Sequence, residues 1–364
     1  MPVAEPIFRF NPAAPSCHAA TIVEPTPGQL LAAWFAGTHE GHPDVAIWLA
    51  ACEAGRWTSP RKVADVAGVP LWNPVLFRDA RDILWLFFKI GPDVPSWTGG
   101  YLRSRDGGQN WSGPVLLPAG VTGPAKNKPI TLSSGAIAAG ASSETWRSWS
   151  CWLEVSGDAG RTWQRYGPIT PPAELGAGAD DAAEIAQAVP EVISAKWDTT
   201  TRSLLIPQTH RGMIQPALWE YAPGRLRMLM RPTRRIGRVC LASSDDFGRT
   251  WSAAEPLPIP NPNSGLDAVR LEDGRIVLAC NPVPEGRTPL SLLVSEDNGA
   301  TWPHRLDLET APGEHSYPSI IQAKDGRVHV VATHQRQQIF HYTIDPRDLD
   351  LPAKTSLTVP VWSR

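Results

Sequence analysis

The stretch 104–111, "SRDGGQNW", is a polar turn that ends in tryptophan, and close relatives of it recur along this chain of 364 residues. The shared pattern is Ser-x-Asp-x-Gly-x-x-Trp, and three of the four good copies have Thr immediately before the Trp. A worn fifth copy occurs in "CEAGRWTSP", where Gly55 and Trp57 remain but the Ser and the Asp are missing. The good copies occupy residues 104–111, 156–163, 244–251 and 295–302.

Each residue type in this pattern stabilises a tight turn. A short Asp side chain accepts hydrogen bonds from backbone amides of its own turn, Gly adopts a positive φ without strain, and Ser or Thr closes the ring from the other side. The turn therefore satisfies its own polar groups. We expect the Trp to be the first inward-facing residue of the next strand, with its ring covering the hairpin and its N–H free to find a partner.

The spacing of these turns predicts the architecture. Trp57, Trp111, Trp163, Trp251 and Trp302 are separated by 54, 52, 88 and 51 residues, and the interval of 88 corresponds to two units of 44, one of which has lost its turn signature. A period of about 40 to 50 residues with one turn signature per unit is typical of a β-propeller blade of four antiparallel strands. The intervals from Trp57 to Trp302 amount to five units, and with the last unit, "VHVVATHQRQQIFHYTID", they predict six blades.

Short apolar runs between the turns have the composition of strands. They are rich in β-branched and aromatic residues and are bounded by Gly, Pro, Asp or Asn, as in "GQLLAAWFAG" and "ILWLFFKI". The many turns account for the 37 prolines and 30 glycines. Because a propeller grows by adding blades, we expect one all-β domain over residues 1–364, a six-bladed propeller of four-stranded antiparallel blades.

Charge, hydropathy and cysteine content exclude several classes of function. A net charge of −2 argues against an electrostatic nucleic-acid binder. No window approaches the roughly 18 uninterrupted apolar residues of a membrane span. The first ten residues, "MPVAEPIFRF", lack the basic and apolar regions of an export signal, so we expect a cytoplasmic protein without a membrane partner. The cysteines, which we expect to be buried small hydrophobes in a reducing compartment, are Cys17, Cys52, Cys151, Cys240 and Cys280.

The repeated turns at propeller spacing resemble the Asp-boxes, or bacterial neuraminidase repeats, of the sialidase superfamily. The stretches "AAWFAGTHEGHPDVAIWL", "KNKPI", "IPNPNSGLDAVRLEDGR" and "HSYPSI" are similar to the cytoplasmic "predicted neuraminidase" branch of that superfamily. The resemblance spans nearly the whole chain. It implies an exo-acting glycoside hydrolase that cleaves a terminal, carboxylate-bearing sugar, with an acidic sugar or oligosaccharide as its partner and no cofactor.

The resemblance also implies roles for particular residues. Sialidases resemble one another in three arginines that clamp the substrate carboxylate, a Tyr nucleophile paired with a Glu, and an Asp acid/base on a loop of the first blade. On this pattern Tyr317 in "HSYPSI" is the nucleophile, Arg231 and Arg287 are the second and third arginines, and Asp44 in "GTHEGHPDV" is the acid/base. A neutral nucleophile suits an anomeric carbon that bears a carboxylate, because an Asp or Glu would be repelled.

Two positions depart from the sialidase pattern. The place of the Glu that pairs with the Tyr is occupied by Gln215, which cannot take a proton, and Glu314 or Glu144 is left as a replacement. The first arginine has a counterpart in Arg9 of "IFRFNP", but the strand that would enter the pocket starts nearer "PSCHAATIVE" and presents His18. His18 is therefore a further candidate for proton transfer.

Other polar residues are candidates for substrate contact. Lys126 and Lys128 stand in "GPAKNKPI", at the entry to an inner strand, and Asn263 stands in the turn "NPNSGLD". Glu40 lies in the loop "THEGHPD", together with two histidines and Asp44. That spacing is not the helical two-histidine pattern of zinc proteases and no Cys accompanies it, so we expect no metal site.

Two alternative functions remain open at this point. A lyase would use the same arginines to neutralise a uronate carboxylate while His18 or Tyr317 removes the adjacent proton and protonates the leaving oxygen. A non-catalytic glycan-binding propeller would explain Gln215 as the mark of a lost activity. The sugar, its linkage and the oligomeric state are not specified by the sequence.

Overall fold

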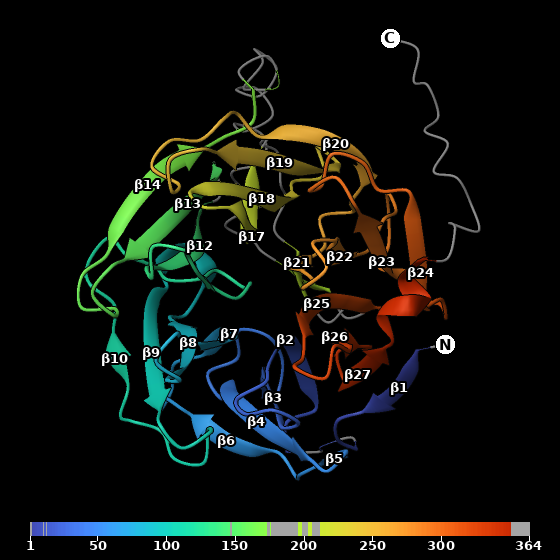
Figure 1. The fold of residues 1–364 in the computed structure, drawn as a ribbon. Coiled ribbons are helices and arrows are strands. Elements are labelled where there is room, and N and C mark those ends of the chain that lie inside the picture. The colour runs from blue at the N-terminus through green and yellow to red at the C-terminus, as the bar shows by residue number, and fades with distance from the viewer. Residues whose placement is uncertain are drawn as a thin grey trace.

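The computed structural model describes residues 2–9, 11, 13–145, 148–172, 175, 196–198, 203–205 and 212–350. The strands in these ranges form six antiparallel sheets arranged around a central axis, together with one separate two-stranded pair (Figure 1). The prediction of an all-β, six-bladed propeller is confirmed. Within the described ranges, none of the helical segments has the length and apolar character that crossing a bilayer requires.

The first three blades follow the chain in order, each from its inner to its outer strand. In blade 1 the short β5 and β6 both pair with β4 and share the outer position. Blade 1 contains β2 (Ser16–Val23), β3 (Leu30–Gly37), β4 (Ala46–Glu53), β5 (Arg56–Trp57) and β6 (Arg61–Ala64). Blade 2 contains β7 (Leu71–Arg78), β8 (Leu84–Ile90), β9 (Thr98–Ser104) and β10 (Val115–Leu116). Blade 3 contains β11 (Ile130–Thr131), β12 (Ile137–Glu144), β13 (Trp149–Ser156) and β14 (Gln164–Ile169).

The last three blades repeat this order, except that the outer strand of blade 6 comes from the start of the chain. Blade 4 contains β17 (Met213–Ala222), β18 (Arg225–Pro232), β19 (Arg238–Ser244) and β20 (Glu255–Pro260). Blade 5 contains β21 (Asp267–Arg270), β22 (Ile276–Cys280), β23 (Leu290–Ser295) and β24 (His304–Glu309). Blade 6 contains β25 (His315–Gln322), β26 (Val328–His334), β27 (Gln338–Ile344) and β1 (Val3–Pro6). Short 3₁₀ helices are η1 (Val94–Ser96) and η3 (Pro346–Asp350).

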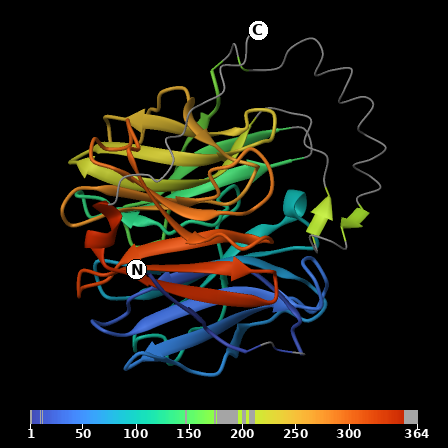
Figure 2. The same ribbon diagram turned by 90° about the vertical axis from the view of Figure 1, so that its right-hand side faces the viewer.

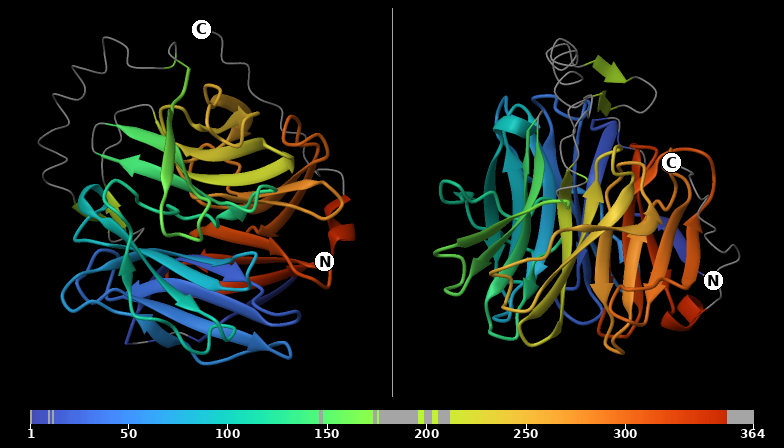
Figure 3. Two further views of the ribbon diagram at one scale, coloured as in Figure 1. Left: turned by 60° about the vertical axis from the view of Figure 1, so that its left-hand side comes forward. Right: turned by 90° about the horizontal axis from the view of Figure 1, so that it is seen from above.

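Strand β1 closes the ring by pairing antiparallel with β27, from Val3 opposite Thr343 to Pro6 opposite Phe340. In Figures 1 and 3 the dark blue β1 accordingly lies beside the red strands of blade 6. This arrangement explains why the last unit has no Asp-box. The boxes stand in the turns from the third to the fourth strand, and blade 6 has no such turn because its fourth strand is β1.

The interval between Trp163 and Trp251 does not contain the extra, boxless blade that its length predicts. It holds β14 of blade 3 and the first three strands of blade 4, and the six blades are complete without another unit. The additional length lies in residues 170–212, most of which are outside the described residues. The described part includes the antiparallel pair β15 (Lys196–Asp198) and β16 (Ser203–Leu205). Figure 2 shows this pair at the same edge of the propeller as η1.

The Asp-boxes form the self-satisfied turns that their sequence predicts. In the first box the Asp106 carboxylate accepts hydrogen bonds from Ser104 Oγ at 2.8 Å and from Asn110 N at 2.9 Å. Ser104 Oγ in turn accepts from Gly108 N at 2.9 Å. The other three boxes make the same contacts with Thr in place of Asn110, and the Thr hydroxyl donates to the second carboxylate oxygen.

The box tryptophans lie just before the fourth strand rather than within it, and each is half-buried. Trp111, Trp251 and Trp302 donate their indole N–H to the carbonyl of the box Gly, at 3.1, 2.8 and 3.1 Å. The indole N–H of Trp163 is buried and has no hydrogen-bond partner among the described residues. The expected ring contact with the hairpin is therefore present, but one of the four rings lacks its polar contact.

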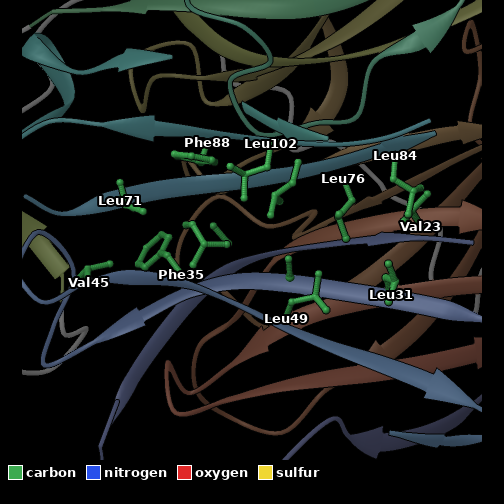
Figure 4. Close-up of a cluster of buried hydrophobic side chains, with 14 of the residues drawn as sticks. Val23, Leu31, Phe35, Val45, Leu49, Leu71, Leu76, Leu84, Phe88 and Leu102 are labelled. Atoms are coloured by element: carbon green, nitrogen blue, oxygen red, sulfur yellow. The ribbon is translucent and has the colours of Figure 1, made fainter. Parts of the chain in front are cut away.

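Hydrophobic side chains fill the space between neighbouring blades. Figure 4 shows one such cluster, in which side chains of blade 1 such as Phe35 and Leu49 face side chains of blade 2 such as Leu76 and Phe88. All four of these residues are at most 2% exposed. Blades 5 and 6 pack in the same way. The five cysteines are free and buried, as expected, and each occupies a strand.

The unequal hydrogen bonding of the box tryptophans predicts unequal costs of replacement. Trp251→Phe removes a donor that bonds Gly248 O and should lower the free energy of unfolding by about 1 kcal/mol more than Trp163→Phe, which removes an N–H without a partner. Urea unfolding of the two variants measures the difference. Equal losses would show that the indole hydrogen bond does not stabilise the turn.

The box carboxylates predict a loss of stability in acid. Hydrogen bonds from the backbone and side chain of Thr162 lower the pKa of Asp158 to about 2, and the other three boxes behave alike. The pKa of Asp158 in the folded protein lies below the unfolded value of about 3.9. The ionised carboxylate therefore stabilises the fold above pH 4, and this stabilisation is lost as the pH falls toward 2. In thermal melts, Asp158→Asn should therefore melt below the wild type at pH 5 and converge with it near pH 2. A difference in melting temperature between Asp158→Asn and the wild type that stays the same from pH 5 to pH 2 would show that the Asp158 carboxylate is not the cause of the acid lability.

Candidate active site at the strand-start face

The candidate residues collect at one face of the propeller because the inner strands all run in the same direction along the axis. His18, Gln215 and Tyr317 lie near the first residues of β2, β17 and β25, and Lys126 and Lys128 precede β11. The turns from the second to the third strand of each blade end at this same face. The Asp-boxes follow the third strands and therefore lie at the opposite face.

A bulge near the start of four inner strands re-aims one side chain in each. Ala19, Asn73, Gln215 and Tyr317 have positive φ values of 56, 41, 55 and 53°. Each stands at a register shift in its ladder. In three cases the next residue is a proline, which has no N–H to be left unpaired at the bulge. Such backbone is unfavourable for a bulky residue by roughly 1 to 3 kcal/mol and clusters at functional sites.

Tyr317 lies among cations. Its hydroxyl is hydrogen-bonded to Nη1 of Arg231. The guanidinium carbon of Arg287 lies 5.5 Å, and Nζ of Lys126 5.9 Å, from the centroid of the Tyr317 ring. The His18 ring packs against the Tyr317 ring, and the two ring centroids are 4.0 Å apart. The structure thus brings together the predicted nucleophile, the two predicted arginines and His18.

Arg231 is held by neutral groups. Its Nη1 donates to Gln215 Oε1 at 3.1 Å and its Nε donates to Asn263 Oδ1 at 2.8 Å. Its guanidinium also lies 5.9 Å from the centroid of the Trp149 ring. The side chain is 6% exposed. Because Gln215 supplies an amide oxygen where the sialidase pattern has a carboxylate, the charge of Arg231 is not neutralised at this contact.

Arg287 shares a carboxylate with an arginine that the sequence analysis missed. Glu314 Oε1 accepts from Arg287 Nη1 at 2.5 Å, and both oxygens of Glu314 accept from Arg336 Nε, at 3.0 and 3.1 Å. Arg336 Nη1 also donates to Glu40 Oε2 at 2.6 Å. Burial raises the pKa of Glu314, but the two guanidiniums outweigh it and lower the net value. Glu314 is therefore ionised and engaged, and Arg336 is neutralised on both sides.

His18 is a neutral imidazole with a defined tautomer. Arg336 Nη2 donates to its Nε2 at 3.3 Å, so Nδ1 carries the proton and donates to Thr333 Oγ1 at 2.9 Å. Burial is the largest cause of a pKa well below the usual value, and the nearby charges of Arg336, Arg287 and Arg231 lower it further. The ring is 1% exposed.

The two lysines differ in their surroundings. Lys126 Nζ donates to the carbonyl of Pro318 and to Asn127 Oδ1, and burial lowers its pKa to about 7 against the opposing charge of Asp267. Lys128 Nζ instead forms an ion pair with Asp267 at 2.9 Å. Lys128 therefore has a carboxylate partner, whereas Lys126 is held by neutral oxygens.

Asp44 and Glu144 offer carboxyl groups of opposite character. Asp44 accepts from Thr38 N at 3.0 Å and from Thr38 Oγ1 at 2.6 Å, and its side chain is 45% exposed. Although burial acts to raise its pKa, the bonds from Thr38 lower the net value. Glu144 accepts from Ser142 Oγ at 2.6 Å, and burial raises its pKa despite the charges of Arg231 and Lys89. A raised pKa is the property that a proton donor requires, and of the two only Glu144 has it.

Positive charge exceeds negative charge in this cluster. Each carboxylate already has at least one cationic partner. In the part of the chain that the structure describes, Arg231 and Lys126 form no ion pair. An anion of suitable shape would therefore find two buried donors beside the Tyr317 ring. The cations are Lys126, Lys128, Arg231, Arg287 and Arg336, and the paired carboxylates are Glu40, Asp267 and Glu314.

Sequence reasoning could not have found Arg336 from spacing. It stands in the hairpin between β26 and β27, where Gln335 and Arg336 have φ values of 53 and 52°. Its partners Glu314 and Glu40 come from blade 6 and from the loop between β3 and β4. The only signal was an Arg in a polar hairpin, "HQRQQ", which usually indicates an exposed residue.

Comparisons with known proteins agree with this fold. Residues 28–330 match the model of the BNR repeat-like domain family. A Hadza microbial sialidase is 15% identical, with a TM-score of 0.70 over 93% of this chain and 67% of that one. A mutant of the NanB sialidase from Streptococcus pneumoniae is 12% identical, with a TM-score of 0.70 over 94% and 70%. A protein of unknown function from Dyadobacter fermentans is 18% identical, with a TM-score of 0.70 over 93% and 97%.

No curated protein sequence matches this chain. The structural likenesses lie between 12% and 18% identity and show the fold alone. The roles of the individual site residues remain predictions.

The titration of Lys126 predicts pH-dependent binding of an acidic ligand. Below its pKa of about 7 the amine is charged, so glucuronate should bind roughly tenfold more tightly at pH 6 than at pH 8. Isothermal titration calorimetry measures the affinity. Lys126→Met should bind weakly and with little change between these pH values, and Lys62→Met, an exposed control in β6, should behave as the wild type. A steep pH dependence in Lys126→Met would contradict the assignment.

Proposed function

We propose that this chain, which belongs to the BNR repeat-like domain family, is an exo-acting glycoside hydrolase that releases a terminal, carboxylate-bearing sugar. One observation carries the proposal. The hydroxyl of Tyr317, a residue held in a strained backbone conformation at the axis, is bonded to Arg231, whose charge no carboxylate neutralises among the described residues. A nucleophile beside a guanidinium that has no carboxylate partner suits a substrate whose anomeric carbon bears a carboxylate.

The carboxylate of the sugar would be bound by Arg231 and Arg287. Among the described residues, Arg231 makes its contacts through Nη1 and Nε, and Arg287 makes its contacts through Nη1 alone. Each guanidinium therefore retains N–H groups for a ligand. Arg336 is 2% exposed and lies between Glu40 and Glu314, so its role is to hold Glu314 and His18 in place.

Attack by Tyr317 needs two proton transfers. Glu144, with its raised pKa, is the described carboxyl best suited to protonate the leaving oxygen as the glycosidic bond breaks. Gln215 cannot take the phenolic proton. The phenolic proton would pass to solvent as the bond to the sugar forms, while Arg231 donates to the tyrosine oxygen. Water would then release the sugar from the tyrosine.

A lyase is the second candidate, and the neutral His18 favours it. The imidazole lies 4.0 Å from the Tyr317 ring, between centroids, and no described hydrogen bond joins a carboxylate to the Tyr317 hydroxyl. In this reaction Arg231 and Arg287 would neutralise a uronate carboxylate and make the adjacent C–H more acidic. Tyr317 or His18 would then move the proton. The products differ, because a lyase forms an unsaturated sugar that absorbs in the near ultraviolet.

Replacement of the tyrosine tests both reactions. Tyr317→Phe keeps the packed ring but removes the oxygen, so turnover of a panel of acidic-sugar glycosides should fall by about a thousandfold or more while ligand affinity changes little. Tyr342→Phe is the matched control, because Tyr342 is buried in the interface of blades 5 and 6. Wild-type protein that binds acidic oligosaccharides without turnover would instead indicate a glycan-binding propeller.

Gln215→Glu separates the two chemistries. A carboxylate at Gln215 would lie within bonding distance of Arg231 and could take the Tyr317 proton. Hydrolysis of a sialoside should therefore rise several-fold if Tyr317 is a nucleophile that lacks a base. In a lyase the same anion would oppose the uronate, and product absorbance should form more slowly. His18→Ala should be the more damaging change for the lyase, and Tyr317→Phe for the hydrolase.

A further inference from the structure

Three potential metal ligands converge where blade 5 meets blade 6. Glu309 ends β24, His315 begins β25 and His334 ends β26, and one ligand atom from each lies within 4.8 Å of the others. His315 and His334 are direct neighbours across the ladder of β25 and β26. The His315 ring is 1% exposed, whereas Glu309 and His334 are half-buried, so the group is reached from one side.

The imidazoles of this group have unused polar atoms. Among the described residues, both ring nitrogens of His315 and Nδ1 of His334 are buried without a hydrogen bond of ordinary geometry, although the backbone of Ala311 lies close to the His315 ring. The two ring centroids are 4.6 Å apart. A second buried pair shows the usual solution, since His329 Nδ1 bonds His341 Nε2 at 2.9 Å and Glu5 accepts from His341 at 3.2 Å. Buried polar atoms without partners are rare, and a missing water or ion is one explanation of them.

We propose that Glu309, His315 and His334 bind a divalent transition-metal ion, with zinc the best match to the ligand set. Two imidazoles and one carboxylate, with water in the fourth position, form a common zinc environment. Tetrahedral zinc places ligand atoms about 3.3 Å apart, so the three side chains must close slightly around the ion. The site is separate from the loop between β3 and β4, which holds His39, Glu40 and His42.

The carboxylate is already oriented for this role. The backbone amides of Thr310 and Ala311 both donate to Glu309 Oε1 at 2.9 Å, which leaves Oε2 available to an ion. Such supporting contacts fix the direction of a ligating group.

The metal would join the two blades directly behind the candidate active site. Glu314 immediately precedes His315, and Gln335 and Arg336 immediately follow His334. The two segments are already joined by the ladder of β25 and β26, which the bond from the Gln335 amide to the Glu314 carbonyl, at 2.7 Å, extends. An ion bound to Glu309, His315 and His334 would add a link from β24 of blade 5 to this ladder and would stiffen the backbone that presents Glu314 and Arg336.

Zinc content and cobalt spectroscopy test the proposal on the full, untagged chain. After chelation and dialysis, the wild type should take up about one Zn²⁺ per chain by calorimetry. Co²⁺ in place of Zn²⁺ should give the visible absorption of a four- or five-coordinate ion. His315→Ala and His334→Ala should lose stoichiometric binding, while His42→Ala, which breaks the exposed His39–His42 pair, should retain it.

Thermal melting provides a second measurement. Zn²⁺ should raise the melting temperature of the wild type and of His42→Ala but not that of Glu309→Gln, which keeps the shape of the side chain. The wild-type cobalt spectrum decides the matter even if the histidine variants fail to fold. Absence of Zn²⁺ and Co²⁺ binding to the wild type would overturn the proposal, as would binding that His42→Ala abolishes and His315→Ala does not.

Discussion

Closure of the ring is the constraint on which the remaining structure depends. Each blade buries its two faces against its neighbours, so an open ring would expose two apolar sheet faces. The pairing of β1 with β27 prevents this, because blade 6 becomes a complete sheet that contacts both blade 5 and blade 1. Only in a closed ring do the six inner strands begin around a common axis, and only there can side chains of blades 1, 3, 4 and 6 meet.

The sequence predicted the parts of the fold that depend on contacts between residues close together in the chain. The Asp-box is a local hydrogen-bonded turn, and its period revealed both the blade and its approximate length. The boxless unit was misplaced, because the interval before Trp251 contains an insertion and because blade 6 replaces its last turn with β1. Pairing between the two ends of a chain depends on closure and leaves no mark on turn spacing.

The candidate site also contains residues that could be recognised from their neighbours in sequence and residues whose role depends on partners far away in the chain. The proline-flanked segments around Gln215 and Tyr317 were visible in the sequence, and the structure places both at the axis with Arg231 and Arg287. Arg336 could not be predicted, because its importance comes from two carboxylates that lie far away in the chain. Similarly, the neutral state of His18 follows from burial and from neighbouring cations that only the folded ring assembles.

The separation of the two faces has a consequence for how such a protein can change. The Asp-boxes lie after the third strands, whereas the ligand-facing residues lie at the starts of the inner strands and in the loops beside them. Substitutions that alter recognition therefore leave the turns that hold each blade together untouched. A lineage built on this scaffold can vary its ligand widely while inheriting its stability unchanged, and its members should diverge fastest on one side of the disc.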